Sequence, residues 1–334
     1  MRIAIVKLSA LGDIIHAMVG LQFIKKTNPD IEIDWIVEAK FSEILRHNPD
    51  LSQVLTVNLQ SIKQSKLKIF NEYRRIKRYA ENYYDLVIDA QSLIKSSLVA
   101  KLLGGKVFGF DEASSRESFA AFFYDQKVAC SYAKNTIDRN AFILTKPFDL
   151  EVSPEQILAK KPFLFYKNEN TKIFDYFHST KKNVIFVTGS SWESKNYPKQ
   201  KFLQIAQNLH VNCLAIWGNE QEQKNALWLE SQAKNISAMP KMDLNSLKAA
   251  IAKSDLVIGN DTGPTHMAWA LNKPSVTIFG PTPVSRVYQT EINRVIKSPS
   301  KINPYKLNKN DFSIKDIDEH KVIEIAEDLL KFPQ

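Results

Sequence analysis

Short apolar runs alternate with amphipathic segments along most of the chain. The first run, Ile3 to Val6, ends in a polar turn that leads into Ile14 to Lys25, where apolar residues recur at spacings of three and four. A short, fully apolar run is typical of a buried strand, and the three-and-four spacing predicts a helix with one buried face. The chain therefore opens with the strand-turn-helix unit of a parallel α/β sheet.

The same alternation continues to the end of the sequence. Further strands are expected at Ile33–Glu38, Gln53–Val57, Tyr84–Asp89, Lys106–Gly109, Asn183–Thr188, Leu214–Gly218, Ile236–Met239, Leu256–Ile258 and Val276–Phe279. Helices are expected at Lys40–His47, Lys63–Arg78, Phe119–Tyr124, Asn135–Lys146, Pro198–Asn208, Asp243–Ile251 and Ile317–Phe332, with further ones beginning near Asn219 and Gly263. Strands that alternate with helices indicate parallel sheets.

A proline-containing segment, Pro147 to Asn170, breaks this periodicity and is the expected linker. The length of 334 residues suits two domains of about 150 residues each. We expect an α/β domain in residues 1–160 and a second in residues 161–315. The tail helix, residues 316–334, is a candidate to pack back on the first domain.

Composition narrows the class of protein. The two cysteines, Cys130 and Cys213, are far apart and fit no metal spacing, and Cys213 lies in an apolar run that predicts a buried thiol. No apolar run approaches the ~18–20 residues that span a bilayer, and the N-terminus does not resemble a signal peptide, so a cytoplasmic protein is expected. A net charge of +9 favours an anionic partner: nucleic acid, a membrane surface or a phosphorylated substrate.

The stretch Asp255 to Thr282 contains the densest candidate chemistry. It has a strand, a polar turn, a helix start near Gly263 and a second strand. Ligands of open α/β sheets bind where strands end and helices begin, because the first N–H groups of a helix are unpaired. The turn residues that would surround an anion there are Asn260, Asp261, Thr262 and Thr265. Ordinary helix capping is the alternative reading.

The first turn of the chain offers a carboxylate, Asp13, at the edge of the first expected sheet. Only Gly12 is available for close approach of a phosphate, and the absence of G-x-G-x-x-G argues against a dinucleotide site. Asp13 is either a simple helix N-cap or a base that accepts a proton from an incoming hydroxyl.

Two motifs resemble those of the lipopolysaccharide heptosyltransferases of glycosyltransferase family 9. Asp261-Thr-Gly-Pro-Thr-His-Met-Ala268, followed by the strand end at Gly280-Pro-Thr282, is similar to the nucleotide-sugar signature of that family, and Lys7-x-Ser9-x-x-Gly12-Asp13 is similar to its N-terminal pattern. Asp34–Glu38 and Ile88–Ser96 resemble the type I branch more than the relatives that add the second heptose.

The resemblance implies a GT-B fold, with two Rossmann-like domains facing across a cleft. It also implies an inverting transfer of L-glycero-D-manno-heptose from ADP-heptose to a Kdo hydroxyl of Kdo-lipid A. In that reaction Asp13 is the expected catalytic base. The residues expected on the acceptor side are Lys7, Ser9, Gly12, Arg116 and Arg139.

The donor would bind in the second domain. Lys195 is the expected cation for the departing diphosphate, although a lone loop lysine is usually solvated. Ser190, Ser191, Thr262 and the backbone at Gly263 are further expected donors to the phosphates. Two departures weaken this pattern: Gly189-Ser-Ser-Trp-Glu-Ser194 stands where relatives commonly have a His-Ala-Thr-Thr type of run, and Pro264 removes one N–H.

Four more residues have both a ligand role and a structural alternative. Glu222 is expected either to bind the ribose hydroxyls or only to interact favourably with the dipole of its helix. Met242 is expected to contact adenine or to pack in a core. Asp261 is expected to bind sugar hydroxyls, and His266 to bind the diphosphate or hold the turn.

No metal and no cofactor are expected, because no Asp-x-Asp pair ends a strand and no His, Cys and carboxylate cluster has metal spacing. The basic stretch Lys63 to Arg78 suggests contact with an anionic inner-membrane surface, although such runs are usually only solvated. A monomer that binds no nucleic acid is expected. The alternatives are heptosyltransferase II, a transferase for another nucleotide sugar, a nucleic-acid-binding protein and a nucleotide-sugar epimerase.

Overall fold

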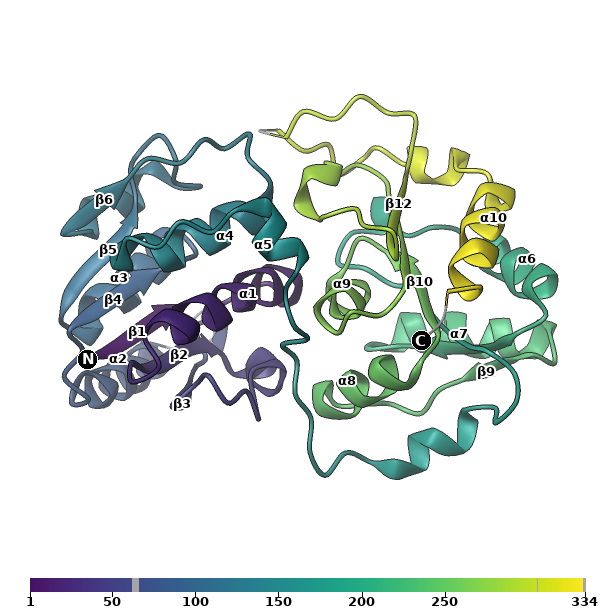
Figure 1. Cartoon of the computed structure of the whole chain (residues 1–334), viewed down its shortest axis with the longest axis horizontal. Coiled ribbons are helices and arrows are strands. Elements are labelled where there is room, and N and C mark those ends of the chain that lie inside the picture. Colours follow the sequence, from purple (N-terminus) through teal and green to yellow (C-terminus); the bar gives the residue numbers. More distant parts are fainter. Residues whose placement is uncertain (62–65, 305, 333–334) are drawn as a thin grey trace. The chain divides into compact units, whose positions relative to one another are not determined.

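The computed structural model describes residues 1–61, 66–304 and 306–332, without the side chains of residues 66 and 67. It contains two compact units, Met1–Phe163 and Leu164–Gln334 (Figure 1). Their boundary falls inside the expected linker and slightly beyond residue 160. The start of the expected basic helix, residues 63–65, lies outside the described residues.

The first unit contains a six-stranded parallel sheet. Its strands are β1 (Arg2–Val6), β2 (Glu32–Glu38), β3 (Gln53–Val57), β4 (Leu86–Asp89), β5 (Lys106–Phe110) and β6 (Gln126–Val128). Their order is β3-β2-β1-β4-β5-β6. The chain adds β2 and β3 on one side of β1 and then β4, β5 and β6 on the other side, while β1 and β4 stay parallel. The carboxyl ends of these two strands form the switch point where α/β sheets bind ligands.

The helices of this unit differ in places from the expected ones. They are α1 (Leu11–Thr27), α2 (Lys66–Ala80), α3 (Ile94–Leu103), α4 (Thr136–Thr145) and α5 (Pro154–Leu158), with short 3-10 helices η1 (Ala39–Ile44), η3 (Ser118–Phe123) and η4 (Lys146–Phe148). In the segments Lys40–His47 and Phe119–Tyr124, expected to be helical, the structure has the 3-10 helices η1 and η3, which end at Ile44 and Phe123. Such helices rarely exceed one or two turns.

The second unit repeats this architecture. Its strands are β7 (Asn183–Val187), β8 (Asn212–Ile216), β9 (Ile236–Ala238), β10 (Leu256–Asn260), β11 (Ser275–Phe279) and β12 (Asn293–Lys297). The order β12-β11-β10-β7-β8-β9 is again fully parallel, with its switch point between β7 and β10. The helices are α6 (Lys199–Leu209), α7 (Glu220–Gln232), α8 (Leu244–Lys253), α9 (Gly263–Ala270) and α10 (Glu319–Leu330), with η5 (Thr171–Tyr176), η6 (Glu193–Lys195), η7 (Val284–Arg286) and η8 (Ser313–Asp316).

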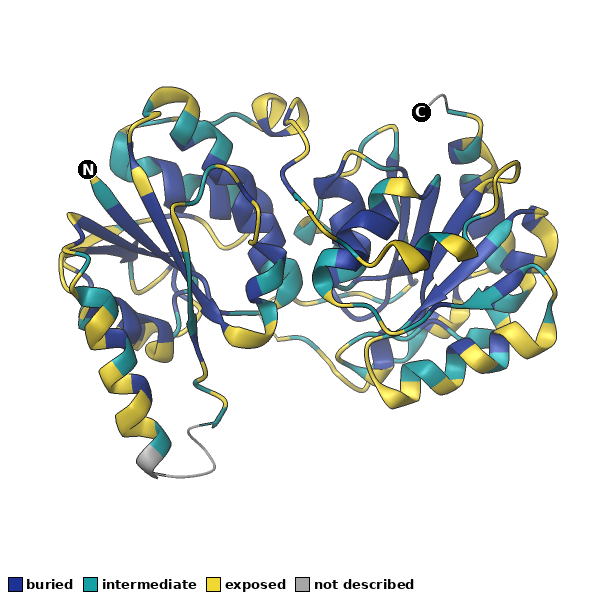
Figure 2. Ribbon diagram, turned by 90° about the horizontal axis from the view of Figure 1, so that it is seen from below, coloured by how far each residue is buried: buried dark blue, intermediate teal, exposed yellow. Residues whose placement is uncertain are grey.

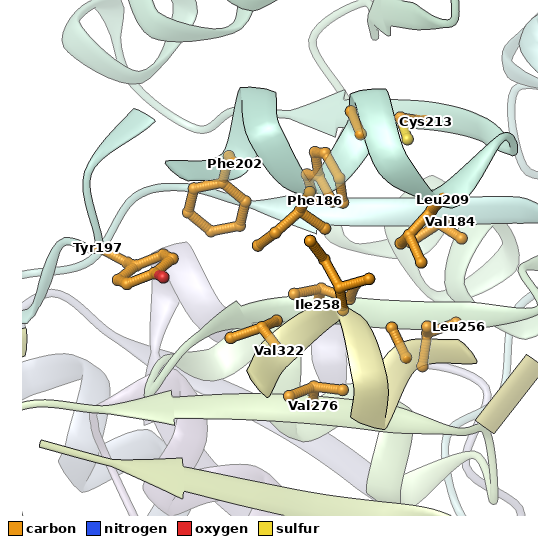
Figure 3. Packing of buried hydrophobic residues seen from close by; sticks show 14 of the residues in the cluster. Val184, Phe186, Tyr197, Phe202, Leu209, Cys213, Leu256, Ile258, Val276 and Val322 are labelled. Carbon is orange, nitrogen blue, oxygen red and sulfur yellow. The ribbon is translucent and has the colours of Figure 1, made fainter. Parts of the chain in front are cut away.

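The tail helix belongs to the core of the second unit. α10 packs against α6 and over β10 and β11. Its inward residues Val322, Ala326 and Leu329 belong to one buried cluster with Phe186 and Phe202. Figure 3 labels Val322 of α10 among these side chains. α10 is therefore part of the second unit, and a contact of the tail with the first domain stays a prediction. Amphipathicity requires an apolar partner for the helix but does not say which one.

Among the described residues, no helix combines the length and the apolar character that crossing a bilayer requires.

Candidate active site

Asn260 connects the segments that meet at the switch point of the second unit. This fully buried side chain ends β10, and its Nδ2 donates to the Thr188 carbonyl at 2.8 Å, just beyond β7. Its Oδ1 accepts from the Tyr197 N–H at 3.0 Å. Asn260 thereby fixes both ends of the loop 188–197 relative to the turn that begins α9.

Asp261 is the centre of a buried polar cluster in that turn. Its Oδ2 lies 2.8 Å from Lys195 Nζ and accepts from Thr282 Oγ1 at 2.7 Å, while its Oδ1 lies 3.0 Å from His266 Nε2. Burial alone would raise the pKa of this carboxyl, but Lys195 and His266 outweigh burial and hold the pKa well below its usual range. Asp261 is therefore ionised, and its binding to sugar hydroxyls stays a prediction.

Lys195 differs from a solvated loop lysine. The residue is 7% exposed, it ends η6, and its ammonium lies 5.8 Å from the centre of the Trp192 ring. An ammonium has three N–H donors. With Asp261 as partner, Lys195 keeps further donors for an anion at this edge of the sheet.

Glu222 lies beside the hydroxyl loop. Its carboxylate accepts from the Gly218 N–H and from Asn219 Nδ2, both at 2.7 Å. A Cβ added at Gly189 would overlap this carboxylate, so the absence of a side chain at residue 189 makes room for Glu222. The carboxylate is thus held at the carboxyl edge of β7 and β8.

The other expected donor-binding residues surround the same edge. Ser190 Oγ donates to the Trp192 carbonyl at 2.8 Å, and Ser191 is exposed. Thr262 is the N-cap residue of α9 without a side-chain cap bond, and Gly263 is the first residue of the helix. Met242, between β9 and α8, is partly exposed, so it is not a fully buried core residue.

The switch point of the first unit carries the residues expected on the acceptor side. Lys7 is buried, which lowers its pKa, and its Nζ donates to the Ala90 carbonyl at 2.7 Å and to Asn140 Oδ1 at 3.0 Å. Gln91 accepts from the N–H groups of Leu8 and Ser9 and donates to Ser9 Oγ at 3.2 Å. These bonds fix the turn in which Gly12 lies.

Asp13 is the third residue of α1 and is partly exposed. Its Oδ2 accepts from the N–H of Ala10, the actual N-cap residue, at 3.3 Å. The alternative of a simple N-cap is therefore wrong in detail, because the carboxylate lies inside the first turn. A carboxylate in the first turn interacts favourably with the helix dipole. The role of Asp13 as a base stays a prediction.

The two expected acceptor cations differ in environment. Arg116 is exposed in the loop after β5. Arg139 donates to the carbonyls of Cys130, Ser131 and Ser114 at 2.5, 2.8 and 2.7 Å, and its guanidinium lies 4.6 Å from the Phe110 ring centre. Through these bonds Arg139 holds together two loops of the first unit. Its contact with an acceptor stays a prediction.

Comparison with known proteins identifies the family. Residues 73–313 match the family model described as glycosyltransferase family 9 (heptosyltransferase). The chain belongs to glycosyltransferase family 9. It is 40% identical to lipopolysaccharide heptosyltransferase 1 of Campylobacter coli over 98% of this chain and 99% of that one. It is 28% identical to lipopolysaccharide heptosyltransferase 1 of Escherichia coli K12 over 84% of this chain and 88% of that one.

Solved structures of the family share the fold. The E. coli heptosyltransferase WaaC with ADP superposes with a TM-score of 0.81, at 21% identity over 98% of this chain and all of that one. The E. coli ADP-heptose lipopolysaccharide heptosyltransferase II superposes with a TM-score of 0.78, at 18% identity over 99% of this chain and 98% of that one. The two parallel sheets are thus those of the GT-B fold, as expected.

No site role was assigned to Thr188 from the sequence, and Thr282 was named only as the end of the signature motif. Thr282 lies three residues beyond the end of β11, and its bond to Asp261 completes the buried cluster. Thr188 has a buried hydroxyl for which the described residues offer no partner. Thr188 comes just after β7, and Thr282 lies just beyond β11, which neighbours β10. Their positions at the carboxyl edge of the sheet could have identified them.

The described residues contain one group with potential metal-ligand spacing, against the sequence expectation. Atoms of Asp318, Glu319 and His320, at the start of α10, lie within 4.8 Å of one another. Asp318 caps the helix and Glu319 lies 3.1 Å from Lys201. Both carboxylates are therefore explained by the fold, and the group lies outside the cluster around Asp261.

Proposed function

We propose that this family 9 glycosyltransferase is a type I heptosyltransferase. It transfers L-glycero-D-manno-heptose from ADP-heptose to a Kdo hydroxyl of Kdo-lipid A, with inversion at the anomeric carbon. The relatives at 40% and 28% identity are both lipopolysaccharide heptosyltransferase 1, and WaaC has been solved with an ADP-heptose analogue. The buried Lys195–Asp261 pair at the β10 edge carries the proposal, because a fixed cation beside the N-terminus of α9 suits a diphosphate.

The proposed mechanism needs a base and a means of stabilising the leaving group. Asp13 takes the proton of the acceptor hydroxyl as that oxygen attacks the anomeric carbon, and the bond to the diphosphate breaks. Lys195 and the first N–H groups of α9 stabilise the charge that develops on ADP. Asp261 holds the Lys195 ammonium in place, which avoids reorganisation during the reaction.

Turnover is proposed to need no metal and no cofactor. Lys195 and the helix N-terminus take the role that Mg²⁺ has in many phosphate sites. The enzyme is proposed to act as a monomer at the cytoplasmic face of the inner membrane, since its acceptor is lipid-linked.

The deciding experiment measures ADP release from ADP-heptose with and without Kdo-lipid A, in the presence of a chelator. We expect release that depends on the acceptor and survives the chelator. Asp13→Ala should lower kcat by about 10²–10⁴-fold. Loss of activity that Mg²⁺ restores would overturn metal independence. Undiminished release in Asp13→Ala would return that residue to a structural role.

Control substrates separate the alternatives. Faster transfer to an acceptor that already carries the first heptose would indicate heptosyltransferase II. A faster reaction with another nucleotide sugar would indicate that this sugar, not ADP-heptose, is the donor. Conversion of the donor without any acceptor would indicate an epimerase. Nucleic-acid binding that falls steeply with salt, in a protein without transferase activity, would indicate the remaining alternative.

A further inference from the structure

One helix layer of the first unit exposes an unusual number of large apolar side chains. The layer consists of α2, α3 and η3, with α2 against α3 and α3 against η3. Its inner side packs on the sheet face that carries Ala4, Val6 and Val107. Seven large apolar side chains on its outer side are at least 38% exposed: Ile69, Phe70, Tyr73, Ile94, Leu98, Phe119 and Phe122. We call these seven the apolar patch.

The clustering is stronger than chance exposure would give. The described part of the chain exposes fourteen large apolar side chains, and half of them belong to this one layer. Single exposed apolar residues are normal, but a group of them on adjoining elements marks an interaction surface. In Figure 2, exposed residues recur along α2, the helix at the lower left.

The aromatic part of the apolar patch is ordered. The rings of Phe119 and Phe122 stack at 5.7 Å, and Phe123 meets them edge-on at 6.0 and 5.7 Å. Phe123 packs against the core, whereas Phe119 and Phe122 are 62% and 74% exposed. The core thus holds two phenyl rings outward in a fixed arrangement, which reduces the entropy lost on binding.

The same layer carries much of the positive charge of the chain. α2 has six lysines and arginines and a single acid, Glu72, which is buried and lies 3.0 Å from Arg75. α3 adds Lys95 and Lys101, and Lys101 lies 2.8 Å from Asp125. The Arg74 guanidinium lies 4.1 Å from the centre of the Phe70 ring, so cation and apolar patch adjoin directly.

We propose that α2, α3 and η3 form a docking surface for an anionic phospholipid bilayer. Lysines and arginines on such a surface attract lipid phosphates, while phenyl, tyrosine and aliphatic groups enter the headgroup region. A nucleic acid would match the cations and could stack on the rings, but it leaves Ile69, Ile94 and Leu98 without a suitable partner. An anionic bilayer offers a partner both to the cations and to the apolar patch.

The position of the surface fits the proposed reaction, on which its biological meaning rests. α3 begins just after β4, at the switch point of the first sheet. Glu117, next to the expected acceptor residue Arg116, accepts the Ile94 N–H at 2.7 Å. Docking through α3 and η3 therefore brings the acceptor edge of the first unit close to the membrane in which a lipid-linked acceptor lies.

The test is sedimentation of the full-length protein with vesicles that contain no acceptor. Vesicles of phosphatidylethanolamine and phosphatidylglycerol are compared with vesicles of phosphatidylcholine. We expect binding to the anionic vesicles only, weakened by salt. Arg74→Gln with Lys77→Gln and Arg78→Gln should lower the partition coefficient about 100-fold. Phe119→Ser with Phe122→Ser should lower it at least ~10-fold.

The matched control carries the same kinds of change on another exposed surface: Leu227→Ser with Lys224→Gln and Lys234→Gln in the second unit. This variant should bind like the parent. Near-ultraviolet circular dichroism and transfer to a deacylated, water-soluble acceptor check that the patch variants are folded.

Apart from a lack of vesicle binding, four outcomes would overturn the docking surface. They are equal binding to both vesicle types, patch variants that bind like the control, binding of RNA but not vesicles, and a concentration-dependent dimer that the patch substitutions abolish. A protein that binds vesicles but transfers no heptose would leave the surface standing and overturn the proposed function. A protein that transfers heptose but does not bind vesicles would support the proposed function and overturn the docking surface.

Discussion

Asp261 and Lys195 show how a single buried contact combines stability with chemistry. Both residues are at most 7% exposed, and removal of either one takes the lysine–carboxylate ion pair away from the buried charge that remains. An unpaired buried charge is costly, whereas the pair orients the ammonium for a phosphate. Substitution of one partner should therefore affect both folding and donor binding.

Lys195→Met is expected to lower the free energy of unfolding at neutral pH by about 3–5 kcal/mol and to abolish measurable ADP binding. The stability deficit should shrink as pH falls below about 4. The depressed pKa of Asp261 means that the parent loses stability on acidification, while in the variant protonation relieves an unpaired charge. Urea unfolding across pH and calorimetric titration with ADP measure both effects.

Lys182→Met is the matched control, because Lys182 pairs at 3.1 Å with Asp255 at a site where the lysine is 44% exposed. Its cost should be about 0–1 kcal/mol. Equal costs for the two lysine variants would contradict a special role for the buried pair.

Gly189→Ala is expected to weaken ADP binding with little change in stability. The added methyl would displace the Glu222 carboxylate, which is the far end of a flexible side chain and can move. If Glu222 binds the ribose, the affinity lost in Gly189→Ala should match that of Glu222→Ala, and the double variant should lose no more. Unchanged affinity in Glu222→Ala would mean that Glu222 has no part in binding, and additive losses would mean that Gly189→Ala acts independently of Glu222. By contrast, Gly259→Ala would overlap Val187 in the buried sheet and should unfold at lower urea.

At the scale of elements, the sequence predicted every central strand but missed two of the edge strands. The apolar runs of β1, β4, β7 and β10 are central and buried, and they were all expected. The edge strands β6 (Gln126–Val128) and β12 (Asn293–Lys297) were missed, because half-exposed edges lack a continuous apolar run.

The C-terminal helix gives a prediction at this scale. Leu329→Ala in α10 should lower the free energy of unfolding of the second unit by about 2–5 kcal/mol, because Leu329 is 1% exposed in its core. Urea unfolding followed through Trp217 and Trp228, which pack against that core, measures the effect. Leu227→Ala, at a residue 50% exposed, should change the value by no more than about 0.5 kcal/mol. Equal values would mean that α10 does not stabilise the unit.

At the scale of the whole molecule, the chain uses one topology twice with different chemistry at each switch point. The first presents Asp13 beside a turn fixed by Lys7 and Gln91, and the second presents the Lys195–Asp261 cluster. This division predicts that nucleotide binding is confined to the second unit.

Hydrogen exchange tests that division in the full-length protein. ADP at about 100 times its dissociation constant should slow exchange up to about 100-fold in segments 188–195, 218–222 and 260–266. Segment 7–13 should exchange at an unchanged rate. Equal protection of segment 7–13 would contradict the assignment of the nucleotide to the second unit alone.

The sequence by itself determined the fold class, the two α/β units, the buried thiol of Cys213 and the family, because apolar periodicity and short turn motifs depend on neighbours along the chain. Only the tertiary structure decided which groups meet. The pairing of Lys195 with Asp261, the contribution of Thr282, the loop contacts of Arg139 and the packing of α10 all join residues distant in sequence. Periodicity reports that a side chain is buried but not against what, since the partner depends on strand order and crossover direction.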